Sequence, residues 1–261
     1  MTDIQLAIKL IKQVNKLLLK RFRPSGTDTL KMKKGEEIVT QADMDANKLM
    51  TNFLLKHFPN DDIISEEAPK INNPGKKTWY IDPLDGTTNF AYGFREFATC
   101  LARVDENGEI EIGVIGLPAF NEIFWATKNS PAYLNSKKIH VSKDNEHRAR
   151  EMFLLCGGHS DKGQQKFTKI MQKINPKQIR FRSFASAGVE FSAVACGRAD
   201  GCALVEAHHW DVLDGILIVR SAGGKVTNFK GANWTIKDTT VLASNDCVHD
   251  KLLELVAPDV D

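Results

Sequence analysis

The first part of the chain combines apolar and basic positions at helical spacing. Residues 3–22 carry lysines at positions 9, 12, 16 and 20, and apolar side chains recur between them. Such spacing gives a helix one apolar and one basic face, and Pro24-Ser25-Gly26 would end it. We therefore expect a surface helix packed on the domain, in preference to a helix lying on a membrane.

The rest of the first half predicts one long helix and then a series of strands. The polar, lysine-rich stretch 27–37 predicts a loop or a hairpin, and a helical pattern covers 43–57. Ile63-Ile64 are short and extended, and Glu106-Asn107-Gly108 predicts the turn of a hairpin. Strand patterns begin at Trp79 and then cover 99–105, 110–117, 122–127, 132–135 and 138–141.

The second half alternates strand and helix patterns after a polar, charged stretch at 142–151. The expected strands cover 152–156, 179–182, 201–205 and 240–243, and the expected helices cover 161–174, 187–197, 211–222 and the end of the chain from 248. Antiparallel strands followed by strand–helix alternation predict a layered α+β fold. We expect an N-terminal α+β lobe, 1–145, and a C-terminal α/β lobe, 146–261, that completes the site.

Composition and charge exclude several classes of protein. The chain has 261 residues, 42% hydrophobic and 26% charged, as in ordinary globular proteins. A net charge of +2 creates no overall field, so we expect neither a membrane nor a nucleic acid as partner. No stretch is long and apolar enough to span a bilayer. The five cysteines are scattered without a CxxC pair, which predicts free thiols in the cytoplasm.

One short stretch places acids where a buried strand should end. Residues 79–90 read WYIDPLDGTTNF, in which Asp82 and Asp85 follow a run of bulky apolar residues. The Gly-Thr-Thr that comes next predicts a tight turn opening a helix, with one of the two threonines as N-cap. There the amides of Gly86 and Thr87 would suit an anion. Carboxylates for a cation beside amides for a phosphate favour metal-assisted phosphate chemistry; the alternative is an ordinary turn in which Asp and Thr only cap.

Further acids strengthen this interpretation. Glu66-Glu67 follow the short strand at 63–64, so they could lie beside Asp82 at the end of a neighbouring strand. Asp43 and Asp211 each stand at the start of an expected helix. Each has a routine explanation: an N-cap for Asp43 and Asp211, a solvated loop for the glutamates. Several carboxylates packed together would repel one another unless cations neutralise them.

Other known motifs do not match this sequence. Asp82 and Asp85 are three residues apart, unlike the alternate acids of an EF-hand and unlike the acids of haloacid-dehalogenase-type phosphatases, which are two apart. No G-x-S-x-G elbow and no Walker loop is present. His208-His209 could suggest zinc, but adjacent side chains point apart and hard oxygen ligands predominate nearby.

Four motifs together resemble the signatures of the inositol monophosphatase family. They are DPLDGTT, the preceding EE, the upstream VTQAD and the downstream WD with its following AGG, and the resemblance runs from about residue 5 to 255. It implies a Mg²⁺-dependent, lithium-sensitive sugar-phosphate phosphatase. The implied fold is a layered αβαβα sandwich of the sugar-phosphatase type, usually found as a dimer. A small phosphorylated metabolite and a second copy of the chain are then the expected partners.

The resemblance also implies two or three Mg²⁺ ions in each site. Carried over by position, Glu66, Asp82 and the backbone carbonyl of Leu84 hold the first ion. Asp82, Asp85 and Asp211 hold the second. A third, weaker ion would lie near Glu66 through waters.

The catalytic roles follow from the same resemblance. The Thr87 hydroxyl, polarised by Asp43, positions the attacking water together with Glu66, while Glu67 is expected in the second shell or in solvent. The implied substrate contacts are Asp85, the amides of Gly86 and Thr87, Ala187 and Glu206.

The substrate side departs from the family pattern. Many members carry a glutamate seven residues before the Asp of W-D, but that position is Leu204 here and Glu206 is five before. Either Glu206 serves through a shortened loop, or the hydroxyl contact is absent. The usual G-[ST]-A reads Ala185-Ser186-Ala187. Asp214, one turn after Asp211, is expected in solvent; the alternative is that it reaches toward the metals or a cationic substrate.

We therefore expect hydrolysis of a small phosphate monoester by a metal-activated water, with inositol 1-phosphate or a related sugar or polyol phosphate as substrate. Histidinol phosphate, fructose 1,6-bisphosphate and 3′-phosphoadenosine 5′-phosphate are alternatives within the same chemistry. From a different class, the chain could be a regulatory member of the fold that binds RNA or protein. Intact acids and an intact threonine favour catalysis, because a pure binder has no need of all of them.

Overall fold

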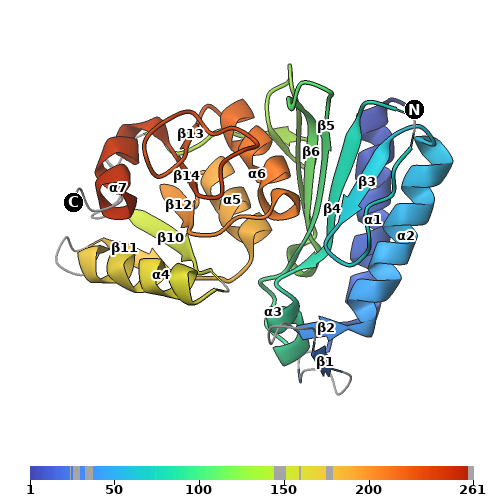
Figure 1. Ribbon diagram of the computed structural model, residues 1–261, viewed down its shortest axis with the longest axis horizontal. Helices are drawn as coiled ribbons and strands as arrows, with labels where there is room; N and C mark the ends of the chain where they lie inside the picture. Colours follow the sequence, from blue (N-terminus) through green and yellow to red (C-terminus); the bar gives the residue numbers. More distant parts are fainter. Residues whose placement is uncertain are drawn as a thin grey trace.

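Two sheets and three layers of helices alternate along the molecule. The structure is a computed structural model that describes residues 1–23, 25, 30–32, 38–73, 75–143, 151–158, 160–174 and 179–257. Helices, sheet, helices, sheet and helices follow one another from one end to the other (Figure 1). The predicted αβαβα layering is therefore confirmed. The division into lobes 1–145 and 146–261 stays a prediction, since helices of the second half pack on the first sheet.

The larger sheet is built from the first half of the chain. Its seven described strands lie in chain order, and only the first two neighbours are parallel. The middle of the sheet is buried on both faces because helices cover it from both sides. Its strands are β3 (Asp62–Ser65), β4 (Thr78–Asp85), β5 (Ala98–Val104), β6 (Ile110–Leu117), β7 (Glu122–Thr127), β8 (Tyr133–Leu134) and β9 (Lys137–Lys138).

The smaller sheet comes from the second half and is mixed. Its described strands lie in the order β11-β10-β12-β14-β13, parallel on one side of β12 and antiparallel on the other. The strands are β10 (Met152–Cys156), β11 (Arg180–Arg182), β12 (Gly201–Leu204), β13 (Lys225–Thr227) and β14 (Val241–Ser244). A separate antiparallel pair, β1 (Leu30–Met32) with β2 (Ile38–Thr40), confirms the hairpin alternative there; the rest of 27–37 lies outside the described residues.

Helices form the three remaining layers. One pair, α1 and α2, covers the outer face of the larger sheet, and α5 and α6 lie between the sheets (Figure 1). The outer face of the smaller sheet is covered by α4 and α7 (Figure 1). The bounds are α1 (Asp3–Arg21), α2 (Gln41–His57), α3 (Thr87–Tyr92), α4 (Asp161–Ile174), α5 (Ala187–Ala195), α6 (His209–Ser221) and α7 (His249–Val256).

The first helix packs as its pattern predicts. Leu10, Ile11 and Val14 are fully buried against the larger sheet, while the lysines of the opposite face are exposed. Gly116 of β6 permits this close packing, because a Cβ there would lie 2.5 Å from the Asn15 side chain. Within the described part of the chain, no helix combines the length and apolar character needed to cross a membrane.

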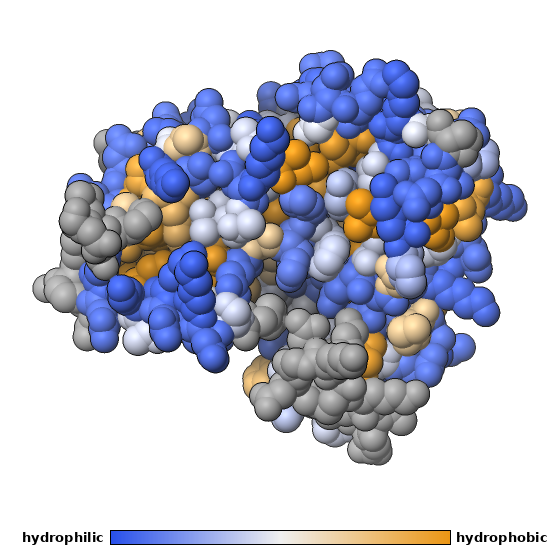
Figure 2. Space-filling model, in the orientation of Figure 1, coloured by the Kyte–Doolittle hydropathy of each residue, from blue (hydrophilic) through white to orange (hydrophobic). Residues whose placement is uncertain are grey.

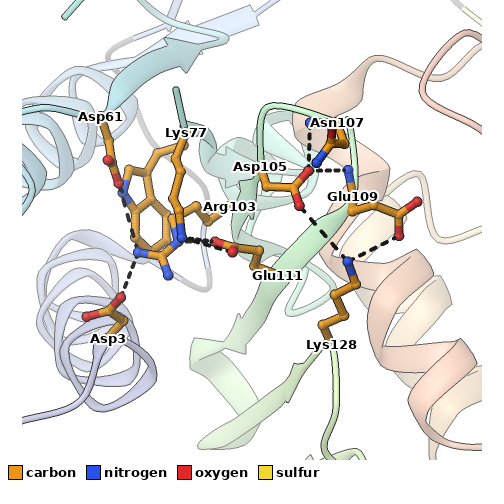
Figure 3. Close-up of polar contacts among 10 residues, drawn as sticks. Asp3, Asp61, Lys77, Arg103, Asp105, Asn107, Glu109, Glu111 and Lys128 are labelled. Atoms are coloured by element: carbon orange, nitrogen blue, oxygen red, sulfur yellow. Dashed lines mark hydrogen bonds and ion pairs between the residues drawn. The ribbon is translucent and has the colours of Figure 1, made fainter. Parts of the chain in front are cut away.

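A buried cation ties α1 to strand β5 inside the larger sheet. The Arg103 guanidinium lies 5.2 Å from the centre of the Trp79 ring. It pairs with Asp3 at 2.8 Å and with Glu111 at 3.0 Å, and Asp61 is a third acid beside it (Figure 3). Because the arginine is only 7% exposed, these acids compensate a charge that would otherwise be costly to bury.

Two strand predictions need correction, and one strand was missed. β4 does not end at Asp82 but continues to Asp85, with a register shift around Pro83, which has no amide hydrogen to donate. The strand expected at 138–141 covers only Lys137–Lys138. β13 was not predicted, because its three residues are too few to show a period of two.

Candidate metal and phosphate site

The predicted site residues meet in one cavity of about 730 Å³. It lies where α3, the start of α6 and the amino-terminal part of α4 face one another, and the surface is indented between the parts that carry α3 and α4 (Figure 2). Asp43 alone among the predicted residues does not line this cavity. Those that do are Glu66, Asp82, Leu84, Asp85, Gly86, Thr87, Ala187, Glu206 and Asp211.

Two parallel strands bring Glu66 and Asp82 together. Ser65 of β3 pairs with Ile81 of β4, and the Glu66 amide donates to the Ile81 carbonyl at 3.2 Å. The carboxyl ends of both strands therefore meet at one edge, as expected from the sequence. Asp82 is 2% exposed, and its Oδ1 accepts a hydrogen bond from the Leu84 amide at 2.9 Å.

A glycine forms the turn that follows. Gly86 has φ of 81°, and a Cβ would lie 3.1 Å from the Glu96 carbonyl, so the position favours glycine twice over. Gly86 is also the N-cap of α3, so the prediction of a threonine N-cap is wrong. Thr87 is instead the first helical residue, and its hydroxyl lies 2.9 Å from Asp43 Oδ1 and 3.0 Å from the Leu84 carbonyl.

Asp43 lies behind Thr87, in the first turn of α2. The routine explanation of Asp43 as an N-cap is wrong: Thr40 is the N-cap, and its amide donates to Asp43 Oδ2 at 2.8 Å in a capping box. The T-x-x-D pattern at 40–43 could have shown this. Burial raises the pKa of Asp43, and hydrogen bonds from Thr40 and Thr87 partly offset the effect. Asp43 accepts the hydrogen bond that the Thr87 hydroxyl donates.

Asp85 joins the two halves of the chain. Its carboxylate accepts hydrogen bonds from Ser186 Oγ at 2.6 Å, the Ala187 amide at 3.1 Å and the Gly188 amide at 2.7 Å. Burial raises the pKa of Asp85 to about 6, although these hydrogen bonds lower it. The sequence did not predict Ser186 and Gly188; the only signal was a serine before an expected helix.

Asp211 reaches the cavity from α6. It is the third helical residue and completes a capping box with His208, so its N-cap interpretation is also wrong. Burial, then repulsion from Asp85 and Glu66, raises the pKa of Asp211 well above its ordinary value. Burial, then repulsion from the neighbouring acids, also raises the pKa of Asp82 well above its ordinary value. The cavity therefore concentrates negative charge that a bound cation would relieve.

The donor set fits a hard divalent cation. Carboxylates and the Leu84 carbonyl are oxygen ligands, which Mg²⁺ prefers. As the described side chains stand, no three Asp, Glu, His or Cys residues converge closely enough to enclose an ion. Binding would therefore draw the carboxylates closer together than they now stand.

Glu206 forms the far wall beside Leu204. Its carboxylate accepts hydrogen bonds from the Ser160 amide, at 3.1 Å, and from the Ser160 hydroxyl. Glu206 thereby connects the end of β12 to the start of α4. Its contact with substrate stays a prediction.

Two further expectations can be compared with the structure. Asp214 is 1% exposed rather than solvated, and its Oδ2 accepts a hydrogen bond from the Leu101 amide of β5 at 3.1 Å. The expectation failed because Asp214 lies on the face of α6 that packs on the larger sheet. His208 stacks on Trp210, whereas His209 contacts the Ile236 carbonyl at 2.7 Å, so the two rings have separate surroundings.

Comparisons with known proteins agree with the site. A family model described as "Inositol monophosphatase family" matches residues 2–261. A Thermotoga maritima protein named fructose-1,6-bisphosphatase/inositol-1-monophosphatase is 33% identical over 258 residues, 98% of this chain and 96% of that protein. The Escherichia coli K12 protein named Nus factor SuhB is 30% identical over 256 residues, 96% and 94% of the two chains. A solved structure of Thermotoga maritima IMPase superposes with a TM-score of 0.87 at 31% identity, covering 98% of this chain and 97% of that one.

Proposed function

Since the chain belongs to the inositol monophosphatase family, whose members are phosphoric monoester hydrolases, we propose that it hydrolyses a small phosphate monoester with the help of Mg²⁺. One observation carries the proposal: acids from both halves of the chain line one cavity together with Gly86 and Thr87. Inositol 1-phosphate, or a related sugar or polyol phosphate, is the substrate we propose.

The acids have distinct ligand roles in this proposal. Glu66, Asp82 and the Leu84 carbonyl would hold a first ion, and Asp82, Asp85 and Asp211 a second, with a third near Glu66. Bound there, Mg²⁺ supplies a water of lowered pKa and neutralises charge on the phosphate and the leaving oxygen. Burial, and then repulsion among the acids, raises the pKa of Asp82 and of Asp211, and this supports the arrangement.

The remaining residues would orient water and phosphate. Thr87 donates a hydrogen bond from its hydroxyl to Asp43, 2.9 Å away, so that a lone pair of its oxygen is turned toward the attacking water. Glu66 accepts the proton that this water loses. The amides of Gly86 and Thr87 donate to phosphate oxygens, which fixes the phosphorus in line with the water.

The substrate alcohol would contact other residues of the cavity. Ala187 and Glu206 also line it, so they are the residues we propose as substrate contacts. Fructose 1,6-bisphosphate is an alternative substrate that the name of the Thermotoga relative favours. Histidinol phosphate and 3′-phosphoadenosine 5′-phosphate are the others that the same ligand set could serve.

We also propose a cytoplasmic homodimer. Free thiols at all five cysteines support a reducing compartment. Light scattering of the purified protein would give twice the monomer mass of 29.1 kDa for a dimer, and the monomer mass would contradict it.

A second candidate function has one observation behind it. The chain is 30% identical to a protein named Nus factor SuhB, a name that describes a factor rather than an enzyme. A regulatory role through RNA or a protein partner is therefore the candidate from a different class. If this candidate is correct, the regulatory function persists when the metal-binding acids are substituted.

A phosphate-release screen tests the first proposal. Purified protein is incubated with about twenty phosphorylated metabolites, including the four named substrates, with Mg²⁺ or with a chelator. We expect the wild type to release phosphate from inositol 1-phosphate or a related ester only with Mg²⁺. The Asp85→Asn variant should release none while it stays folded. If the wild type releases phosphate from none of them, the enzymatic proposal is wrong and the second candidate gains.

A further inference from the structure

A buried glutamate that no proposed step uses lies just beneath the cavity. Glu190, in the first turn of α5, is 0% exposed. Its Oε1 accepts a hydrogen bond from the Phe184 amide at 3.0 Å, and the Ala185 amide also stabilises the charged form. Oε2 is buried and has no hydrogen-bond partner among the described residues. An acid retained at such a cost calls for a specific role.

The amides that Glu190 binds belong to a strained turn. Ala185 has φ of 51°, in the left-handed region that disfavours residues with a Cβ. Glu190 Oε1 accepts from the Phe184 amide just before this residue, and the Ala185 amide lowers the pKa of the Glu190 carboxyl. From the opposite side, Asn89 Nδ2 of α3 donates to the Phe184 carbonyl at 2.6 Å. The turn is thus held between an acid of α5 and an amide of the DGTTNF stretch.

The same turn leads directly into the groups that hold Asp85. Ser186 Oγ, the Ala187 amide and the Gly188 amide all bind the Asp85 carboxylate within 3.1 Å. Ala185 and Ala187 also line the cavity. A chain of contacts therefore runs from Glu190 through the turn to a proposed metal ligand and to the wall next to the substrate.

We propose that Glu190 is a positioning residue, which holds the 184–186 turn so that Asp85 and the wall at Ala185 and Ala187 stand where metal and substrate need them. The proposal rests on the proposed function for its effect on activity, but not for its effect on the turn. Glu190 touches neither substrate nor metal in this role, so its loss should weaken binding more than the chemical step.

Two variants distinguish loss of the hydrogen-bond acceptor at Glu190 from general destabilisation of the fold. Glu190→Gln keeps an oxygen that can accept from Phe184 and Ala185, whereas Glu190→Met keeps the length and removes the acceptor. We expect Glu190→Met to raise KM and the half-saturating Mg²⁺ concentration about tenfold, with kcat within about threefold. Glu190→Gln should stay within about threefold of the wild type in all three quantities. Ala185→Gly, which relieves the strain, should partly restore KM in Glu190→Met.

Asp200→Leu, which also removes a buried acceptor, is the matched control. Asp200 is also 0% exposed and binds a backbone amide, that of Met152 at 2.8 Å, but does not line the cavity. We expect this control to lower the melting temperature and leave KM and the Mg²⁺ requirement unchanged. If Glu190→Met behaves in the same way, Glu190 only stabilises the fold and the proposal is wrong.

Amide hydrogen exchange of the metal-free protein decides the question independently of activity. In Glu190→Met the amides of 184–188 should exchange faster than in the wild type, and in Glu190→Gln they should not. Equal exchange in wild type and Glu190→Met would overturn the proposal. A protein that hydrolyses nothing would refute the proposed function instead, and the exchange result would still stand.

Discussion

Asp43 and Thr87 meet although 44 residues separate them, and their hydrogen bond of 2.9 Å gives the clearest chemical role at the level of single residues. Thr87 can direct a lone pair to a water only while its proton is held by an acceptor. Asp43 is that acceptor, and it is itself fixed by Thr40. We therefore expect this pair of residues to affect the rate of the chemical step rather than the binding of substrate.

Asp43→Asn should therefore lower kcat about a hundredfold with KM within about threefold, because the amide no longer accepts the threonine proton as strongly. Steady-state kinetics with Mg²⁺ would measure this. Asp45→Asn on the same helix, where the acid pairs with Arg21 at the surface, is the control and should leave kcat unchanged. An unchanged kcat in Asp43→Asn would remove Asp43 from the mechanism.

Asp214 is a structural acid rather than a solvated one. Its carboxylate accepts the Leu101 amide at 3.1 Å in the middle of the larger sheet, so Asp214→Ala leaves a buried donor unsatisfied. We expect a loss of about 2 kcal/mol in the free energy of unfolding, measured by denaturant titration. Asp250→Ala, whose side chain is 89% exposed, should cost well under 1 kcal/mol. A loss no larger for Asp214→Ala than for Asp250→Ala would contradict the structural role.

At the level of elements, α6 carries Asp211 and must lie close to the larger sheet. Gly113 of β6 permits this, since a Cβ there would lie 2.8 Å from the Asp214 carbonyl and 2.9 Å from its Cα. The backbone of the helix, not a flexible side chain, is what a larger residue would meet. The distance between α6 and the sheet thus fixes the depth at which Asp211 enters the cavity.

Gly113→Ala should therefore push α6 outward, cost about 2 kcal/mol in stability and lower the apparent Mg²⁺ affinity. Gly223→Ala is the control: its φ is 86°, so alanine is strained, but nothing lies within 4 Å of the new Cβ. It should cost about 1 kcal/mol and leave Mg²⁺ dependence as in the wild type. The same Mg²⁺ response in both variants would show that α6 does not set the site.

Patterns in the sequence predicted some helices and strands closely and missed others. The helix α1 was predicted closely because burial of one face dictates its pattern, and β6 was predicted because an apolar run follows the turn at 106–108. Short β13 and the continuation of β4 through Pro83 left no periodic signal. Motif residues gave the acidic part of the cavity lining, whereas the wall formed by Cys156, Gly157, Gly158, Gln164 and Phe167 carries no motif. Ser186, Glu190 and the burial of Asp214 escaped prediction, because they depend on which helix face meets which sheet.

At the scale of the whole molecule, charge buried between the two halves makes stability depend on pH. Burial raises the pKa of Asp85 to about 6 and those of Glu190 and Asp214 to about 8. The ordinary values are 3.8 for aspartate and 4.5 for glutamate, so these groups bind protons more tightly in the folded state. Their stabilisation is complete at low pH and is lost as pH rises through the folded pKa values.

Without divalent metal, we thus expect the melting temperature to fall between about pH 5 and about pH 8.5. Saturating Mg²⁺ should raise the melting temperature more at the higher pH, because ionised acids bind the cation and protonated ones do not. Differential scanning calorimetry with and without Mg²⁺ at both pH values measures the effect. A larger Mg²⁺ shift at about pH 5 would contradict this electrostatic description of the cavity.

The central claim is that acids from the two halves form one Mg²⁺-dependent phosphatase site. It is tested most directly by the Mg²⁺ dependence of phosphate release from inositol 1-phosphate, compared in wild type, Asp82→Asn, Asp211→Asn and the exposed-surface control Asp246→Asn. We predict saturable activation in the wild type and the control, with a loss of about a hundredfold or more in both site variants. Activity that persists in a chelator, or in either site variant at the wild-type level, would contradict the claim.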